Sequence, residues 1–292
     1  MFPVFLVGPT ASGKSAIALE LADRLGAEIV SADSMQVYRG MDIGTAKPTA
    51  AERRQIPHLL LDVCDINEPF DVKQFVKLAS PHLTRALVVG GTGMYVRSLR
   101  QGLFTGPGRN AVLRVRLEAL PVEQLFAELQ QLDPQAATTI DRHNPRRLIR
   151  ALEVFHATGQ SIRQFQTQTS RPTDFIFGLE RDRKDLFARI ERRIDEQIAA
   201  GWVGEVRQLL AHGLAQNLIA MQAAGYRELA AHLAGELTLP AVVTLIKTRT
   251  RQLARRQLTW FRREPGLVWI PVAADEPPAI TAAKILEKLP SR

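Results

Sequence analysis

The first hundred residues alternate between short apolar runs and stretches in which apolar residues recur at helical spacing. Residues 3–7 and 28–30 are typical of strands, and residues 15–25 between them place apolar side chains three or four positions apart. Runs at residues 59–63 and 86–89 are almost continuously apolar, as in strands that are buried on both faces of a parallel sheet. The pattern predicts an α/β fold in which helices flank a parallel sheet.

Helical spacing takes over after residue 100, for example at residues 122–132 and 146–156, with only Pro and Gly turns between the segments. We therefore expect an α-helical insertion domain at residues 101–169, and an α/β catalytic core formed by residues 1–100 and 170–292. The second part of the core is predicted to contain strands at 175–179 and 267–270 and long helical stretches at 185–213 and 239–263.

The balance of charge is basic: the 292 residues contain 38 Lys and Arg against 30 Asp and Glu, a formal net charge of +8. Such a surplus suits a polyanionic partner, and it equally suits a basic surface that is merely solvated. The hydrophobic and charged fractions, 46% and 23%, are those of an ordinary globular protein. Charge alone leaves the partner open.

Cysteine usage and hydropathy exclude several classes. Cys64 is the only cysteine, so an internal disulfide or a cysteine-based zinc module cannot form. The apolar run at residues 2–7 is too short for a signal peptide, and no run approaches the roughly 18 apolar residues that span a bilayer. We expect a cytoplasmic protein with no membrane partner, and nothing requires more than a monomer.

A phosphate-binding loop is predicted at Gly8-Pro9-Thr10-Ala11-Ser12-Gly13-Lys14-Ser15, which fits G-x-x-x-x-G-K-[ST] between a predicted strand and a predicted helix. In that geometry, backbone N–H groups and the positive end of the helix dipole converge on a phosphate. Lys14 adds a charge, and the Ser15 hydroxyl can ligate a magnesium ion that bridges phosphate oxygens. The loop predicts a diphosphate or triphosphate ligand but not a reaction.

An acidic residue usually holds the magnesium at the end of a neighbouring apolar strand. Leu59-Leu60-Leu61-Asp62 offers Asp62, although the residues after it leave the end of that strand unclear. The run at 86–89 passes into Gly90-Gly91-Thr92-Gly93 without an acid. An ordinary NTP hydrolase is therefore less favoured.

Two further segments follow predicted strands and should reach the same crevice, because ligands of open α/β sheets bind beyond the carboxyl ends of the strands. Asp33 follows the second strand and is a candidate general base, with capping of a following helix as the alternative. Thr92 lies among three glycines after a later strand, and those glycines favour close approach to a ligand over a plain tight turn.

These segments together resemble the tRNA dimethylallyltransferases, also called tRNA isopentenyltransferases. The similar segments are GPTASGKS at 8–15, SADSMQVY at 31–38, MDIGTAKP at 41–48, VGGTGMY at 89–95, PRRLIRALEVF at 145–155, GYR at 225–227 and TRQLARRQLTW at 250–260. They run in order over nearly the whole chain. The resemblance implies a P-loop NTPase-like fold with a helical insertion that contacts tRNA.

The resemblance also implies the reaction: transfer of a dimethylallyl group from dimethylallyl diphosphate to the exocyclic amine of adenosine-37, beside the tRNA anticodon, with release of diphosphate and with Mg²⁺ as cofactor. Asp33 is then the base, and Lys14 and Thr92 complete the catalytic set. The implied diphosphate contacts are residues 8–15, Arg114 and Arg193. The implied tRNA contacts are Asp33, Ser34, Met35, Gln36, Thr92, Arg114, Arg146, Arg147, Leu148, Ile149, Arg150, Gln222, Ala223, Ala224, Gly225, Tyr226 and Arg227.

Basic segments could bind the RNA backbone. Such a reaction needs firm RNA binding, because the adenine must leave its stack to reach the active site. Arg146 and Arg150 share one face of a predicted helix. Residues 247–263 contain seven basic residues and no acidic one, which suits phosphate contacts, whereas Trp260 and Phe261 are expected in the core.

Three alternatives remain at this point. A P-loop kinase of a small metabolite or nucleotide leaves the basic helical segments unexplained. A prenyltransferase that acts on free adenine nucleotides shares the chemistry and differs in the acceptor. A non-enzymatic RNA-binding module gives no reason for a phosphate loop with Asp33 in reach.

Overall fold

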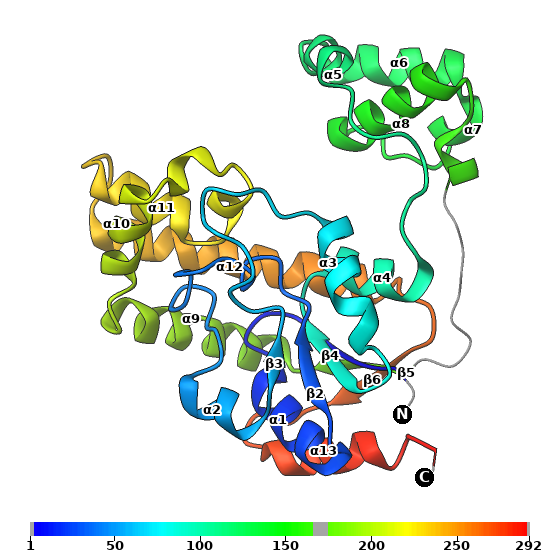
Figure 1. Cartoon of the computed structure of the whole chain (residues 1–292). Helices are drawn as coiled ribbons and strands as arrows, with labels where there is room; N and C mark the ends of the chain where they lie inside the picture. The colour runs from blue at the N-terminus through cyan, green and yellow to red at the C-terminus, as the bar shows by residue number, and fades with distance from the viewer. Residues whose placement is uncertain (1–2, 166–174, 291–292) are drawn as a thin grey trace. The chain divides into compact units, whose positions relative to one another are not determined.

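The computed structural model describes residues 3–165 and 175–290 (Figure 1). The chain divides into two compact units: the core unit, Met1–Arg100 with Arg171–Arg292, and the insertion unit, Gln101–Ser170. The second expected domain boundary, between residues 169 and 170, lies outside the described residues. Each unit has a hydrophobic core of its own.

The sheet of the core unit has six parallel strands in the order β3-β2-β4-β1-β5-β6. The strands are β1 (Val4–Val7), β2 (Glu28–Ser31), β3 (His58–Leu59), β4 (Ala86–Gly90), β5 (Phe175–Glu180) and β6 (Leu267–Pro271). Because all six run the same way, their carboxyl ends form one rim, where the predicted ligand crevice belongs. The predicted α/β class with a parallel sheet is confirmed.

Helices cover both faces of this sheet (Figure 1). In β1, Val4 and Leu6 pack toward α1 and α13, whereas Phe5 and Val7 pack into the larger core on the opposite face. The helices are α1 (Lys14–Leu25), α2 (Ala50–Gln55), α3 (Val72–Ala79), α4 (Gly93–Gln101), α9 (Arg183–Ala199), α10 (Trp202–Ala211), α11 (Tyr226–Leu233), α12 (Leu239–Phe261) and α13 (Pro278–Leu286).

The insertion unit is helical. Its helices are α5 (Ala111–Glu118), α6 (Val122–Leu132), α7 (Pro134–Ala137) and α8 (Pro145–Thr158). Leu125 and Leu129 of α6 pack against Leu148 and Leu152 of α8 in a small apolar core, as their four-residue spacing allows. The Asn144 side chain caps α8 by accepting a hydrogen bond from a backbone N–H of its first turn.

Two predicted elements are wrong in extent. The strand expected at 59–63 ends at Leu59, because Leu60 and Asp62 have φ angles of 64° and 57°, which turn the chain out of the extended conformation. The helical stretch expected at 185–213 is two helices, α9 and α10, which are separated at Gly201 with a φ of 98°. The spacing of apolar residues did not reveal the end of this strand or the break between these two helices.

Candidate active site

The phosphate loop lies between β1 and α1, as predicted. Gly13 has a φ of 94° and occupies the N-cap of α1, where no side chain among the described residues accepts from the N–H groups of the first turn. The loop is bent further by Ala11, with a φ of 63°. The free N–H groups and the helix dipole leave the start of α1 ready to bind an anion.

Two arginines that were not among the predicted site residues fix the loop from outside. Arg181 donates from Nε to the carbonyl oxygen of Ser12 at 2.8 Å, and Arg189 donates from Nε to that of Ala11 at 3.0 Å. These bonds satisfy the carbonyl groups of the two loop residues. Arg181 and Arg189 come from β5–α9, about 170 residues further along the chain, so no local motif points to them.

Lys14 lies within the pocket, and its Nζ donates to the carbonyl oxygen of Pro9 at 2.6 Å. The pKa of Lys14 is lowered to about 7, chiefly by burial and also by the nearby Arg193 guanidinium, whereas the Asp33 carboxylate opposes the shift. A bound diphosphate would favour the charged ammonium. Affinity for that anion is therefore coupled to proton uptake.

Asp33 follows β2 and lines the same pocket as Lys14 and Arg193. Residues 34–37 form turns instead of a helix, so the helix-capping alternative is wrong: Oδ1 of Asp33 accepts the N–H of Met35 at 2.9 Å in a local turn. A carboxylate has further lone pairs, and these can accept a proton from a ligand. The arrangement keeps a base beside two cationic groups.

The turn after β4 holds the segment around Asp33. The Thr92 hydroxyl accepts the N–H of Ser34 at 3.1 Å, and the Thr92 N–H donates to the carbonyl oxygen of Ala32 at 3.2 Å. Gly90 and Gly91 line the pocket, so the expected close approach of a ligand to these glycines stays a prediction, and the chain itself fills the space on their other sides. A side chain at Gly90 would meet the Ala32 backbone, and one at Gly93 would meet the Trp260 ring.

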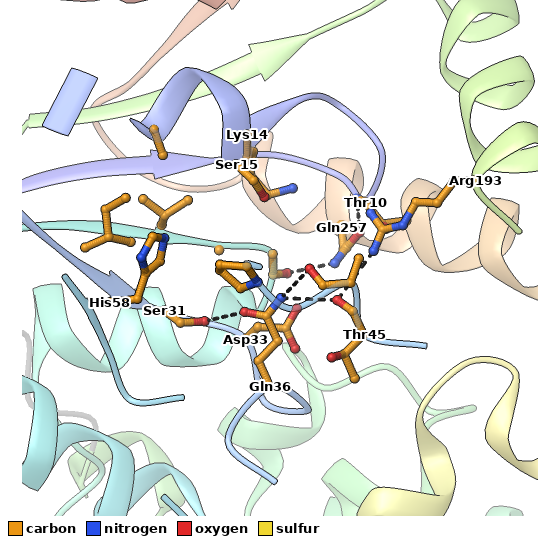
Figure 2. Close-up of a pocket in the computed structure, with 17 residues that line it drawn as sticks. Thr10, Lys14, Ser15, Ser31, Asp33, Gln36, Thr45, His58, Arg193 and Gln257 are labelled. Carbon is orange, nitrogen blue, oxygen red and sulfur yellow. Dashed lines mark hydrogen bonds between the residues drawn. The ribbon is translucent and has the colours of Figure 1, made fainter. Parts of the chain in front are cut away.

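Figure 2 shows the pocket, with His58 and Arg193 toward opposite ends. Of the predicted site residues, the lining includes Thr10, Lys14, Ser15, Asp33, Gln36 and Arg193. Sequence reasoning missed Thr45, His58 and Gln257, which also line it. His58 follows a proline in an apolar context and Gln257 lies within a basic stretch, so neither carried a signal of its own.

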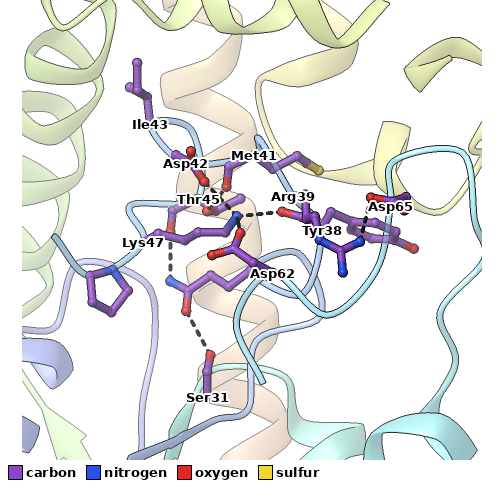
Figure 3. A network of polar contacts seen from close by, with 12 residues as sticks. Ser31, Tyr38, Arg39, Met41, Asp42, Ile43, Thr45, Lys47, Asp62 and Asp65 are labelled. Atoms are coloured by element: carbon purple, nitrogen blue, oxygen red, sulfur yellow. Dashed lines mark hydrogen bonds and ion pairs between the residues drawn. The ribbon is translucent and has the colours of Figure 1, made fainter. Parts of the chain in front are cut away.

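The segment 41–48 beside the pocket is held by a buried lysine (Figure 3). Nζ of Lys47 donates to Asp62 at 2.5 Å, to Asp42 at 2.7 Å and to the carbonyl oxygen of Tyr38 at 2.5 Å, and only 2% of its side chain is exposed. Arg53 binds the other oxygen of Asp62 at 2.7 Å. Asp62, weighed above as a magnesium ligand, is thus a structural anion and is not in the pocket lining.

Distant side chains satisfy the backbone of this segment. Glu205 of α10 accepts the N–H groups of Asp42, Ile43 and Gly44 at 2.9, 2.6 and 3.2 Å. Gln197 of α9 donates to the carbonyl oxygen of Ile43 at 2.6 Å. Helices from the second half of the chain therefore shape the segment next to Asp33.

Residues 222–227 divide into exposed and buried members. Gln222 and Arg227 are exposed, whereas Tyr226 is buried and donates its hydroxyl to Glu205 at 2.6 Å. A side chain at Gly225 would meet the Trp202 ring. The expected tRNA contact by Tyr226 therefore needs correction as far as its side chain is concerned, because Tyr226 supports the segment 41–48 through Glu205.

The predicted residues of the insertion unit differ in the same way. Arg146 and Arg147 are exposed, but Leu148 and Ile149 are buried in the unit's core, so their side chains do not face a ligand. Arg114 and Arg150 both pair with the buried Glu153, at 3.3 and 3.4 Å. The expected roles of Arg114 and Arg150 remain predictions.

The basic stretch on α12 is less available than its sequence suggests. Lys247 pairs with Asp195 at 2.7 Å, Arg251 with Glu191 at 2.5 Å, and Arg249 with Glu228. These three cations face acids on neighbouring helices. Arg262 and Arg263 at the end of the stretch are exposed, and Phe261 is buried as expected.

A metal ion at this pocket would have the Ser15 hydroxyl and the oxygens of a bound phosphate group as its ligands. Within residues 3–165 and 175–290, no group of three or more His, Cys, Asp or Glu side chains could hold a metal ion. Ser15 is exposed at the start of α1 and lines the pocket.

No helix in the described part of the chain has the length and hydropathy of a membrane span.

Comparisons with known proteins identify the family of this chain. The family model described as IPP transferase matches residues 36–264. The tRNA dimethylallyltransferase of Geobacter metallireducens is 47% identical over 283 residues, which cover 91% of each chain. That of Pelotomaculum thermopropionicum is 41% identical, over 91% of this chain and 90% of its own.

Solved structures extend the comparison to the fold. The tRNA isopentenylpyrophosphate transferase of Bacillus halodurans is 38% identical, with a TM-score of 0.72 over 97% of this chain and 93% of its own. A eukaryotic dimethylallyltransferase that acts on tRNA is 26% identical, with a TM-score of 0.79 over 93% of this chain and 73% of its own. This chain belongs to the IPP transferase family.

Proposed function

We propose that this chain transfers a dimethylallyl group from dimethylallyl diphosphate to the exocyclic amine of adenosine-37, next to the tRNA anticodon, and releases diphosphate. The observation that carries the proposal is that the start of α1, Lys14, Arg193 and Asp33 line the same pocket. It combines an anion site with a base. Family membership and the relatives' activity on tRNA support the same reaction.

The chemistry follows from these residues. The bond between the allylic carbon and the diphosphate oxygen breaks, and a bond from that carbon to the adenine nitrogen forms. Loop N–H groups, Lys14 and Arg193 stabilise the charge that develops on the leaving diphosphate. Asp33 accepts the proton from the amine, which is a weak nucleophile because its lone pair is delocalised into the ring, and such general-base catalysis contributes typically about 100- to 10,000-fold.

Mg²⁺ is the proposed cofactor. The Ser15 hydroxyl and diphosphate oxygens are hard ligands of the kind that Mg²⁺ prefers, and the ion would neutralise charge on the leaving group. Ser15 is exposed and lines the pocket, so its hydroxyl is accessible to such an ion.

The tRNA contacts are proposed to come from exposed residues. Arg146 and Arg147 of the insertion unit and Gln222 and Arg227 of the core unit present polar side chains to solvent. Such groups suit phosphate and base contacts around an adenine that has left its stack. Arg114 is proposed to contact the diphosphate, as the resemblance implies.

The test incubates the protein with Mg²⁺, labelled dimethylallyl diphosphate and unmodified tRNA whose anticodon is followed by two adenosines, and then digests the RNA. We expect label in isopentenyladenosine. Label on AMP but not on tRNA would indicate an enzyme of free nucleotides. Label on neither would contradict prenyl transfer and return attention to a kinase.

A further inference from the structure

Gln257 of α12 joins two segments that the proposed reaction uses. Its Oε1 accepts the N–H of Thr10 in the phosphate loop at 2.9 Å, and its Nε2 donates to the carbonyl oxygen of Gly91 at 3.1 Å (Figure 2). Thr10 offers a donor and Gly91 an acceptor, so one side chain that bonds to both needs an acceptor and a donor. The Gln257 amide supplies both.

The second of these bonds leads toward the base. Gly91 is followed by Thr92, whose hydroxyl accepts the N–H of Ser34 and whose N–H donates to Ala32. Asp33 lies between these two residues. Hydrogen bonds, together with the peptide link from Gly91 to Thr92, thus connect the phosphate loop through Gln257 to the residues on both sides of Asp33.

Gly91 leaves space for this amide. A Cβ added at Gly91 would collide with Nε2 of Gln257. The site is closely packed, so any larger residue at position 91 must displace the Gln257 side chain or shift the turn. The glycine and the glutamine therefore fit each other.

Helix α12 is itself fixed against this turn. Trp260, three residues after Gln257, packs on Gly93, and the Arg97 guanidinium lies 4.6 Å above the Trp260 ring. The Glu264 side chain is fully buried and accepts from Arg97 at 2.9 Å and from Arg100 at 2.6 Å. These contacts fix both the turn that contains Gly91 and the helix that carries Gln257. The Gln257 amide therefore has little freedom to move.

We propose that Gln257 is a positioning residue, which sets the separation between the diphosphate leaving group and the Asp33 base. The inference rests on the proposed function. Displacement requires the reacting atoms to meet at about 3–3.5 Å, and a misplacement of about 1 Å can cost about 100-fold in rate. Gln257 ties the part that holds the leaving group to the part that holds the base, without serving as acid, base or nucleophile.

The test compares Gln257→Leu with Gln252→Leu, which removes an exposed amide from the same helix. Single-turnover prenyl transfer is measured together with separate dissociation constants for diphosphate and for tRNA. We expect Gln257→Leu to lower the rate about 10- to 100-fold, with both dissociation constants within about threefold of the unmodified protein, and Gln252→Leu to change none of them. A rate within twofold of the unmodified protein, or a loss found only in one dissociation constant, overturns the inference.

Gln257→Glu keeps the test meaningful if the leucine variant does not fold. The ionised carboxylate accepts from Thr10 but cannot donate to Gly91, whereas the protonated acid does both. The ratio of its rate to that of the unmodified protein should therefore rise as pH falls from 8 toward 5. A ratio independent of pH overturns the inference. If the unmodified protein transfers no prenyl group, the proposed function itself fails, and that outcome is distinct from an active protein insensitive to position 257.

Discussion

The two sides of the pocket are built in different ways. On the diphosphate side, eight consecutive residues and the start of α1 provide the anion site. On the acceptor side, Asp33 is followed by an irregular segment to residue 48, whose backbone groups bond to Glu205, Gln197 and Arg193 from α9 and α10. The anion site itself comes from one contiguous motif, although Arg181, Arg189 and Gln257 also bond to its backbone. The segment after Asp33 depends on helices that come more than 100 residues later.

This difference has a physical cause. A helix N-terminus leaves its own N–H groups unsatisfied, so a short motif suffices to make an anion site. An irregular segment has no internal ladder, and its backbone polar groups need partners from elsewhere when they are buried. The acceptor side should therefore be sensitive to substitutions far from the reacting atoms.

The largest effect is expected at the base. Asp33→Ala should lower single-turnover prenyl transfer by about 100- to 10,000-fold, because it removes the proton acceptor, while tRNA affinity stays within about threefold. Asp33→Asn, which keeps the hydrogen bond to Met35 but cannot accept the proton, should behave alike. Transfer at the unmodified rate in either variant would remove the base assignment.

Lys14→Ala tests the local side. Hydrogen bonds from a charged group contribute about 1.5–3 kcal/mol, so the KM for dimethylallyl diphosphate should rise about 10- to 100-fold with little change in tRNA affinity. Lys184→Ala, at an exposed lysine of α9, is the matched control. An unchanged KM would contradict a role of Lys14 in holding the diphosphate.

Lys47→Met tests the acceptor side through its buried cation. The change leaves Asp42 and Asp62 without their shared partner. Because both carboxylates are partly exposed, we expect the free energy of unfolding to fall by about 2–3 kcal/mol, below the usual range for a fully buried pair. Arg39→Gln, at the exposed Arg39–Asp65 pair, should cost less than about 1 kcal/mol. Equal denaturation midpoints for the two variants would contradict a structural role of the buried Lys47 cation on the acceptor side.

The pH dependence of diphosphate binding sharpens the role of Lys14. Its pKa is lowered to about 7 in the free protein, so below pH 7 the ammonium is already charged, and above pH 7 binding must take up a proton. Affinity should therefore fall by up to about tenfold per pH unit above 7. Titration calorimetry in buffers of different ionisation enthalpy measures the proton uptake, which should vanish in Lys14→Met.

The smallest effect is expected on the basic face of α12. Lys247 is paired with Asp195, so Lys247→Gln should change tRNA affinity less than twofold and stability by less than about 1 kcal/mol. Arg262→Gln, at an exposed arginine, should weaken tRNA binding more and reduce its salt dependence. Equal effects at the two positions would show that pairing does not decide which cations meet RNA.

Much of the site could be predicted from residue order alone. The motif at residues 8–15 specified Lys14 and Ser15, and the position of Asp33 after a strand predicted its place at the rim. Gln257, Arg181 and Arg189 could not be found in this way, because each bonds to a loop backbone about 170 or more residues distant. Their residue types carried no local signal.

By itself, the sequence determined the parallel α/β class, the helical character of residues 101–165 and the anion site, because each follows from periodicity or from a contiguous motif. Only the tertiary structure decided that Asp62 is a structural anion, that Tyr226 supports a loop, and which cations of α12 are already paired. These roles depend on partners that folding brings together from distant parts of the chain. Burial and pairing, unlike periodicity, are properties of neighbours in space.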